Sequence, residues 1–122
     1  MFAESMKKLV GGNSNFRTVL HTGTYSQLVA MSIPVHEDIG EEVHYDVDQI
    51  LLIIEGMGKA ILNGETKKIK ENDLVIVRAG TTHNFINTGD KPWKLLSIYA
   101  PSEHPDGTVH KTKADAQKAH HT

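Results

Sequence analysis

Short apolar segments and turn residues alternate along most of the chain. The apolar segments are rich in valine, isoleucine, leucine and tyrosine, which favour strands, and glycine, asparagine and proline separate them. Asn63-Gly64 is the clearest turn, because both residues tolerate the positive φ of a two-residue hairpin. The pattern predicts strands near residues 16–21, 25–35, 41–46, 49–55, 57–63, 66–69, 73–78, 82–87 and 93–100.

Many short strands without helical crossovers predict an all-β sandwich or barrel. One helix is predicted, near the C-terminal end, where Thr112 can cap it with Asp115 three residues later. A length of 122 residues suits one compact domain. We therefore expect a single domain over residues 1–122, with the barrel at about 16–100 and a C-terminal loop and helix at 101–122.

Composition narrows the class of protein. The net charge is −2 and no basic stripe is visible, which argues against nucleic acid as a partner. The absence of cysteine excludes disulfides and zinc-thiolate sites. No apolar run approaches the roughly 20 residues of a membrane span, and the N-terminal stretch lacks the apolar core of a signal peptide. We expect a cytoplasmic protein that does not enter a membrane.

The stretch "GEEVHYDVDQILLIIEGMG" places polar side chains directly before an apolar run. Side chains alternate between the two faces of a strand, so Gln49 shares a face with Leu51 and Ile53. A buried amide on that face needs hydrogen-bond partners or a metal ion. His83 alternates with Phe85 in the same way further along the chain. Convergence of His44, Gln49 and His83 on one ion would explain all three polar side chains.

The first of these stretches resembles a motif of the cupin superfamily, in which a glycine, His-x-His, a glutamate and a second glycine follow one another. Gly40 leads in, His44 stands at the first histidine, and Gly56 closes the motif. Counted back from Gly56, Gln49 falls at the glutamate position. Asp46 stands at the second histidine, and the spacing from His44 to Gln49 is one residue short.

The second cupin motif, Pro-x-Gly-x-x-His-x-x-x-Asn, is matched in register by "RAGTTHNFIN". Gly80, His83 and Asn87 occupy their family positions, and Arg78 replaces the proline. The resemblance covers about residues 25 to 100. In its finer pattern the chain resembles small single-domain bacterial cupins that are loosely described as mannose-6-phosphate isomerase-like.

The resemblance implies a cupin double-stranded β-helix, a conical jelly-roll barrel, with one divalent metal ion at its mouth. The implied ligands are His44, Gln49 and His83, with Asp46 or Asp48 as a fourth, although both aspartates also suit a solvated strand end and a turn. Imidazole, amide and carboxylate ligands suit zinc, manganese, iron or nickel. A small polar organic molecule is the expected ligand of such a barrel.

Two classes of function fit this resemblance. The first is a metal-dependent enzyme, either an isomerase or an oxygenase, and the second is a binding or sensing module without turnover. An isomerase needs a general base, and the sequence shows no carboxylate clearly placed inside the barrel. Small cupins commonly pair through an apolar early strand, so "YSQLVAMSIPV" predicts a homodimer.

Several side chains admit two interpretations from the sequence alone. Leu51, Ile53, Phe85 and Ile76 belong either to the core or to the apolar wall of a pocket. The segment "APSEHPDGTVHKTKADA" forms either a surface loop or a flap over the barrel mouth, with His104 or His110 facing the ligand. Tyr99 and Trp93 are expected to be packing residues.

Overall fold

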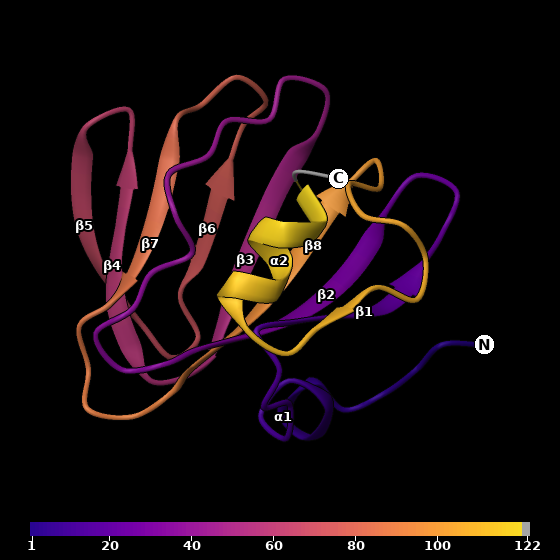
Figure 1. The fold of residues 1–122 in the computed structure, drawn as a ribbon, viewed down its shortest axis with the longest axis horizontal. Coiled ribbons are helices and arrows are strands. Elements are labelled where there is room, and N and C mark those ends of the chain that lie inside the picture. The colour runs from indigo at the N-terminus through magenta and orange to yellow at the C-terminus, as the bar shows by residue number, and fades with distance from the viewer. Residues whose placement is uncertain (121–122) are drawn as a thin grey trace.

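The computed structural model describes residues 1–120 and shows a β-rich fold with two short helices (Figure 1). Residues 121 and 122 of the expected C-terminal helix lie outside this range. The strands are β1 (Arg17–Thr22), β2 (Gln27–Ile33), β3 (Asp48–Glu55), β4 (Met57–Leu62), β5 (Glu65–Lys70), β6 (Leu74–Val77), β7 (His83–Asn87), β8 (Trp93–Ala100) and β9 (Val109–His110). The helices are α1 (Met6–Leu9) and α2 (Lys113–His120).

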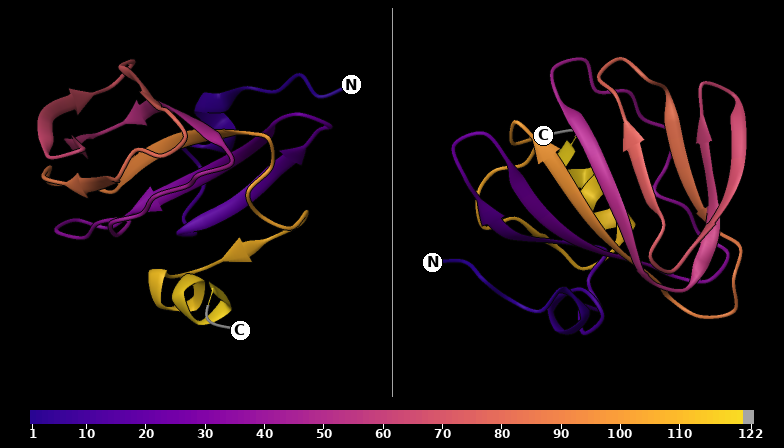
Figure 2. Two further views of the ribbon diagram at one scale, coloured as in Figure 1. Left: turned by 90° about the horizontal axis from the view of Figure 1, so that it is seen from above. Right: turned by 180° about the vertical axis from the view of Figure 1, so that it is seen from behind.

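The strands form two antiparallel sheets that pack against each other. One sheet has the order β6-β3-β8-β2-β1-β9, and the other has the order β5-β4-β7. Figure 2 shows the two layers from above, with the segment that carries β9 and α2 on one side of them. This arrangement confirms the expected all-β jelly roll with a short C-terminal helix.

The alternation of side chains along β3 explains its uninterrupted apolar run. Leu51 and Ile53 are fully buried between the two sheets, together with Phe85 and Trp93. Leu52 and Ile54 point to the opposite face of the same sheet, where they belong to a second apolar cluster. Both faces of β3 are therefore apolar, because one is buried between the sheets and the other is partly covered by the second cluster.

Helix α1 covers part of that second face and was not expected from the sequence. Val10, which directly follows the helix, is fully buried against Ala30 and Leu96, and Met6 packs at the edge of this cluster. The helix has four residues, which is too short for an apolar period to be recognised. The two-residue strand β9 escaped prediction for the same reason.

The hairpin expected at Asn63-Gly64 is confirmed. Both residues have positive φ, 48° and 84°, and β4 pairs with β5 on either side of them. The cap expected for the C-terminal helix is also present, because the backbone N–H of Asp115 donates to Thr112 Oγ1 at 3.1 Å. No helix among the described residues is both long and apolar enough to cross a membrane.

One local prediction is wrong, and the structure decides between the alternatives of another. Residues 41–46 do not form a strand, since only Glu42 makes an isolated bridge, to His83, and residues 45 and 46 form a bend. Of the two interpretations of Ile76, the core is excluded, because its exposed fraction is 56% on edge strand β6, but it does line a pocket together with Leu62 and Ile69. Along β6, Val75 and Val77 face the core, so the alternation of side chains places Ile76 on the outer face.

The premise of the predicted homodimer also changes. The apolar early strand β2 is not an open edge, because it pairs with β1 on one side and with β8 on the other. Its backbone groups are therefore satisfied within the chain. The predicted dimer is not tested by this arrangement, but an unpaired β2 cannot be its cause.

Candidate functional site

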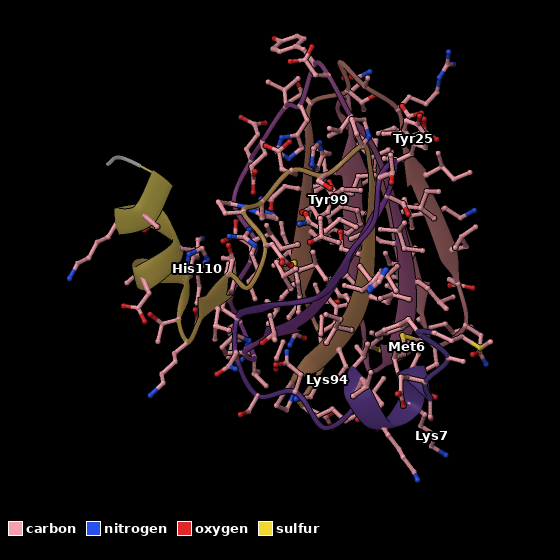
Figure 3. The ribbon with its side chains drawn as sticks, turned by 90° about the vertical axis from the view of Figure 1, so that its right-hand side faces the viewer. Met6, Lys7, Tyr25, Lys94, Tyr99 and His110 are labelled. Carbon is pink, nitrogen blue, oxygen red and sulfur yellow. The ribbon has the colours of Figure 1, made fainter. Side chains whose placement is uncertain are left out.

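A cleft of about 740 Å³ opens on the side of the molecule where α2 lies. Four parts of the chain line it: the start of β1, the irregular segment 39–46, the loop 103–108, and α2 with the end of β9. Figure 3 shows Tyr99 among the strands and His110 between them and α2. Segments that are far apart in the sequence therefore contribute polar side chains to one hollow.

His44 lies at the centre of the polar side chains and bridges two carboxylates. Its Nε2 is 3.2 Å from Glu42 Oε2, and its Nδ1 is 3.4 Å from Glu103 Oε1. The hydrogen bond with Glu42 raises the pKa of His44 despite the opposing effect of burial. Burial raises the pKa of Glu42, but the hydrogen bond and charge of His44 outweigh it, so the pKa of Glu42 lies below its ordinary value. Both changes favour an ion pair at neutral pH.

His83 is brought to the same place by backbone pairing. Glu42 and His83 exchange two backbone hydrogen bonds of 2.9 Å, and the rings of His44 and His83 have centroids 5.4 Å apart. The Nδ1 of His83 lies 2.8 Å from the carbonyl oxygen of Thr81. Since a carbonyl only accepts, Nδ1 carries the proton and Nε2 keeps its lone pair. Burial lowers the pKa of His83, which favours this neutral form.

Gln49 faces inward as predicted, and half of its amide is satisfied. Its Nε2 donates to Ser97 Oγ at 2.8 Å and to Tyr99 Oη at 3.1 Å. Its Oε1 is buried and has no hydrogen-bond partner. The ring of Tyr99 meets that of His44 edge-on, with centroids 6.1 Å apart. A buried acceptor without a partner needs a water molecule or an ion, and Tyr99 connects this one to His44.

One pair of donor atoms in this site has the spacing of two ligands on one metal ion. Among residues 1–120, no three histidine, aspartate or glutamate side chains are already grouped as metal ligands. However, metal–ligand bonds of about 2.0–2.2 Å at right angles place neighbouring ligand atoms roughly 3 Å apart. The 3.2 Å between His44 Nε2 and Glu42 Oε2 matches that spacing. A metal ion could replace the shared proton with little movement of either side chain.

Neither aspartate expected near the metal points into this group. Asp46 is exposed in the bend at residues 45 and 46, although it lies at the rim of the cleft. The bend removes the alternating pleat on which its expected inward orientation depended. Asp48 is exposed, and its Oδ1 accepts a hydrogen bond from the backbone N–H of Ala79 at 2.9 Å. It therefore fastens the turn before β7.

The loop after β8 is held over the cleft by one buried side chain. Gln27 is fully buried, and its Nε2 donates to the carbonyl of His104 at 2.7 Å. Its Oε1 accepts from the backbone N–H groups of Glu103 and His104 at 3.2 and 3.0 Å. Of the two interpretations of this loop, the structure supports the one in which it lies at the barrel mouth with His104 and His110 lining the cleft.

His104 is held as a neutral imidazole. Burial, followed by the charge of Arg17, lowers the pKa of His104 to about 3. Its ring meets Tyr99 edge-on at 5.1 Å, and its buried Nε2 has no hydrogen-bond partner. Below pH 6.5 the unfolded chain binds a proton at His104 that the folded protein excludes, so this residue destabilises the fold as pH falls.

We expect His104→Gln to lose less stability than the wild type between about pH 7 and pH 5. Chemical denaturation at each pH measures the unfolding free energies. His21→Gln, which changes an exposed histidine, serves as the control and should follow the wild type. If His104→Gln and the wild type lose stability in parallel, His104 is not a buried neutral group.

Sequence reasoning missed two carboxylates of this site. Glu103 lies in a loop without a motif, so no local signal identifies it. Glu42 stands two residues before His44, which is the spacing of a ligand pair on an extended segment. That spacing could have identified Glu42 as a candidate.

A family model described as "Cupin domain" matches residues 29–99. The uncharacterized protein YrkC of Bacillus subtilis is 45% identical over 125 residues, which cover 97% of this chain and 67% of YrkC. The chain thus spans about two thirds of the length of that relative.

Two solved structures are also similar to this chain. The crystal structure of BH2720 from Bacillus halodurans has a TM-score of 0.95 and 41% identity, covering 96% of this chain and 93% of that one. A "predicted oxalate decarboxylase" from Thermotoga maritima has a TM-score of 0.60 and 25% identity, covering 62% of this chain and 66% of that one.

Proposed function

The chain belongs to the cupin domain family, and from this premise we propose that it is a metal-dependent enzyme that acts on a small polar organic molecule in the cleft. The proposal rests on one observation above all. Glu42 pairs with His44, and the ring of His83 lies against that of His44. Tyr99 connects His44 to Gln49, whose buried Oε1 has no partner.

In the proposed site, Glu42, His44 and His83 hold one divalent metal ion, and Gln49 Oε1 is a fourth ligand. Two histidines with one carboxylate form a set that leaves positions open on the metal and is typical of non-haem iron oxygenases. Among zinc, manganese, iron and nickel, this mixture of nitrogen and oxygen donors favours iron or manganese. Such an ion would polarise a carbonyl or bind oxygen when loaded.

The protein groups around the proposed ligands have defined roles. Glu103 fixes the ring of His44 through Nδ1, and the Thr81 carbonyl fixes that of His83. Groups of this kind set the tautomer and orientation of metal-binding histidines. Since Glu103 already bonds to His44, it is not a free general base, which favours an oxygenase over an isomerase. The description of the Thermotoga neighbour also points to a small organic molecule as substrate.

Metal analysis of protein purified without chelators tests the proposal. We expect about one metal ion per chain, and loss of that ion in the double variant His44→Ala and His83→Ala. The apolar core does not include these histidines, so the variant should keep its fold, which circular dichroism checks. Stoichiometric metal in the double variant, or its absence from the wild type, would refute the assignment.

The homodimer also stays part of the proposal. The outer face of the six-stranded sheet supports a homodimer, because α1 covers only one end of it. The rest of this face carries half-buried apolar side chains that a second copy could cover: Leu20, Leu28, Leu52, Ile54 and Ile98. Sedimentation at micromolar concentration should show twice the monomer mass. The cytoplasmic location and the single domain over residues 1–122 remain predictions.

A further inference from the structure

Arg17, the first residue of β1, is a buried cation at the cleft. Its exposed fraction is 7%, and it lines the cleft. Its Nη1 lies 3.2 Å from Nδ1 of His110, the residue that Figure 3 shows between the strands and α2. Its Nε is buried and has no hydrogen-bond partner. None of the ion pairs found in residues 1–120 includes Arg17.

The other cations of the cleft are already neutralised. Lys113 pairs with Asp38, and His44 lies between Glu42 and Glu103. Arg17 differs from both, because no carboxylate lies within ion-pair distance of it among the described residues. A guanidinium group does not lose its proton in proteins, so Arg17 cannot escape the cost of burial by becoming neutral.

An unpaired buried charge at a cleft is explained most simply by an anion that binds there. The contact with His110 occupies Nη1 and leaves the edge that carries Nε for such an anion. Guanidinium edges donate two parallel hydrogen bonds, a geometry that matches the two oxygens of a carboxylate. The charge of Arg17 also acts on the proposed metal ligands: after the larger effect of His44 it helps to lower the pKa of Glu42, and it opposes the rise that Glu42 causes in the pKa of His44.

We propose that Arg17 binds the carboxylate of a small organic acid in the cleft, so that the substrate class is a carboxylic acid. The substrate part of this inference rests on the proposed function, whereas anion binding by Arg17 does not. The acid would hold one end at Arg17 and present its remaining groups toward Glu42, His44 and His83.

The sequence offers a direct test, because Arg17 and Arg78 are its only arginines. Nitrogen-15 NMR of the arginine side chains therefore shows two Nε–H signals, which Arg78→Lys assigns. Formate, the smallest carboxylate, is titrated into zinc-loaded and chelator-treated protein. We expect the Arg17 signal to shift as formate is added and to saturate in the millimolar range. A ligand of only three heavy atoms can bind with a Kd of about 1 mM at best. The exposed Arg78 should show no saturable shift.

Variants separate Arg17 from general charge effects. With backbone amide shifts as the readout, Arg17→Gln should weaken formate binding roughly tenfold to hundredfold, as expected for hydrogen bonds to a charged group. Lys113→Gln removes a lining cation that is already paired with Asp38, and the variant should bind formate within about twofold of the wild type. An Arg17 signal that does not respond, or equal affinity in Arg17→Gln, would overturn the proposal. Phosphate that binds at Arg17 more tightly than formate would overturn the assignment to a carboxylate.

The outcomes also distinguish this inference from the metal proposal. Zinc binding to the wild type is measured by calorimetry without formate. Arg17→Gln should still bind one zinc ion per chain, because Arg17 is not a proposed ligand, and the loss of its positive charge should change the affinity only modestly. If formate saturates Arg17 in protein that binds no zinc, the anion site stands and the metal site falls. If zinc binds but Arg17 does not respond to formate, the metal site stands alone.

Discussion

Glu42→Gln is expected to weaken metal binding by more than about a hundredfold, beyond the tenfold-to-hundredfold range typical of groups that only orient a ligand. Glu42 Oε2 is the only carboxylate oxygen found within ion-pair distance of His44 Nε2 in the described residues. The amide of glutamine keeps the size of the side chain but removes the charge that balances a divalent ion. Titration of manganese or zinc into chelator-treated protein measures the loss.

Asp46→Asn is the matched control, because it makes the same chemical change four residues away. Asp46 is exposed in a bend, so its loss of charge should change metal affinity by less than about tenfold. Glu103→Gln should fall between the two, since Glu103 touches His44 but lies on the Nδ1 side of the ring. A larger loss in Asp46→Asn than in Glu42→Gln would restore the ligand set expected from the sequence.

Some positions of the candidate site follow from the sequence pattern, and others do not. His83 lies in a motif that is in register, and β7 buries it with Phe85 and Asn87 as alternation predicts. Gln49 also faces inward as predicted, because β3 is regular. Both positions sit on paired strands, where a period of two determines which way a side chain points.

The first motif can be aligned on His44 in two ways. Taken as the first histidine, His44 leaves the spacing to Gln49 one residue short and puts Asp46 second. Taken as the second histidine, it removes that shortfall and puts Glu42 first. The structure favours the latter, because Glu42 and not Asp46 meets His44 and His83. The segment is irregular, so no strand period could have chosen between the two.

Contacts between distant parts of the chain account for most of what the sequence did not reveal. Gln27 fixes Glu103 and His104 through hydrogen bonds that span more than 70 residues. The pairing of β1 with β9 brings Arg17 to His110 in the same way. Neither contact follows a local pattern, so propensity and periodicity could not predict that these side chains share one cleft.

Gly58→Ala is expected to lower the unfolding free energy by about 3 kcal/mol, the upper end of typical costs for overpacking a core. Gly58 is buried in β4, and a Cβ there would lie 2.4 Å from the carbonyl oxygen of Ile86 and 2.7 Å from the ring of Trp93. The oxygen belongs to β7, which pairs with β4, and Trp93 is fully buried, so neither can move away freely.

Gly64→Ala is the control that separates a steric clash from backbone strain. Gly64 has a φ of 84°, but nothing lies within 4 Å of the position of its Cβ. Its substitution should cost about 1–2 kcal/mol through backbone strain alone. Chemical denaturation of both variants compares the two costs. A loss in Gly58→Ala no greater than that in Gly64→Ala would mean that β4 and Trp93 can separate, and that the two sheets are less tightly packed than these distances require.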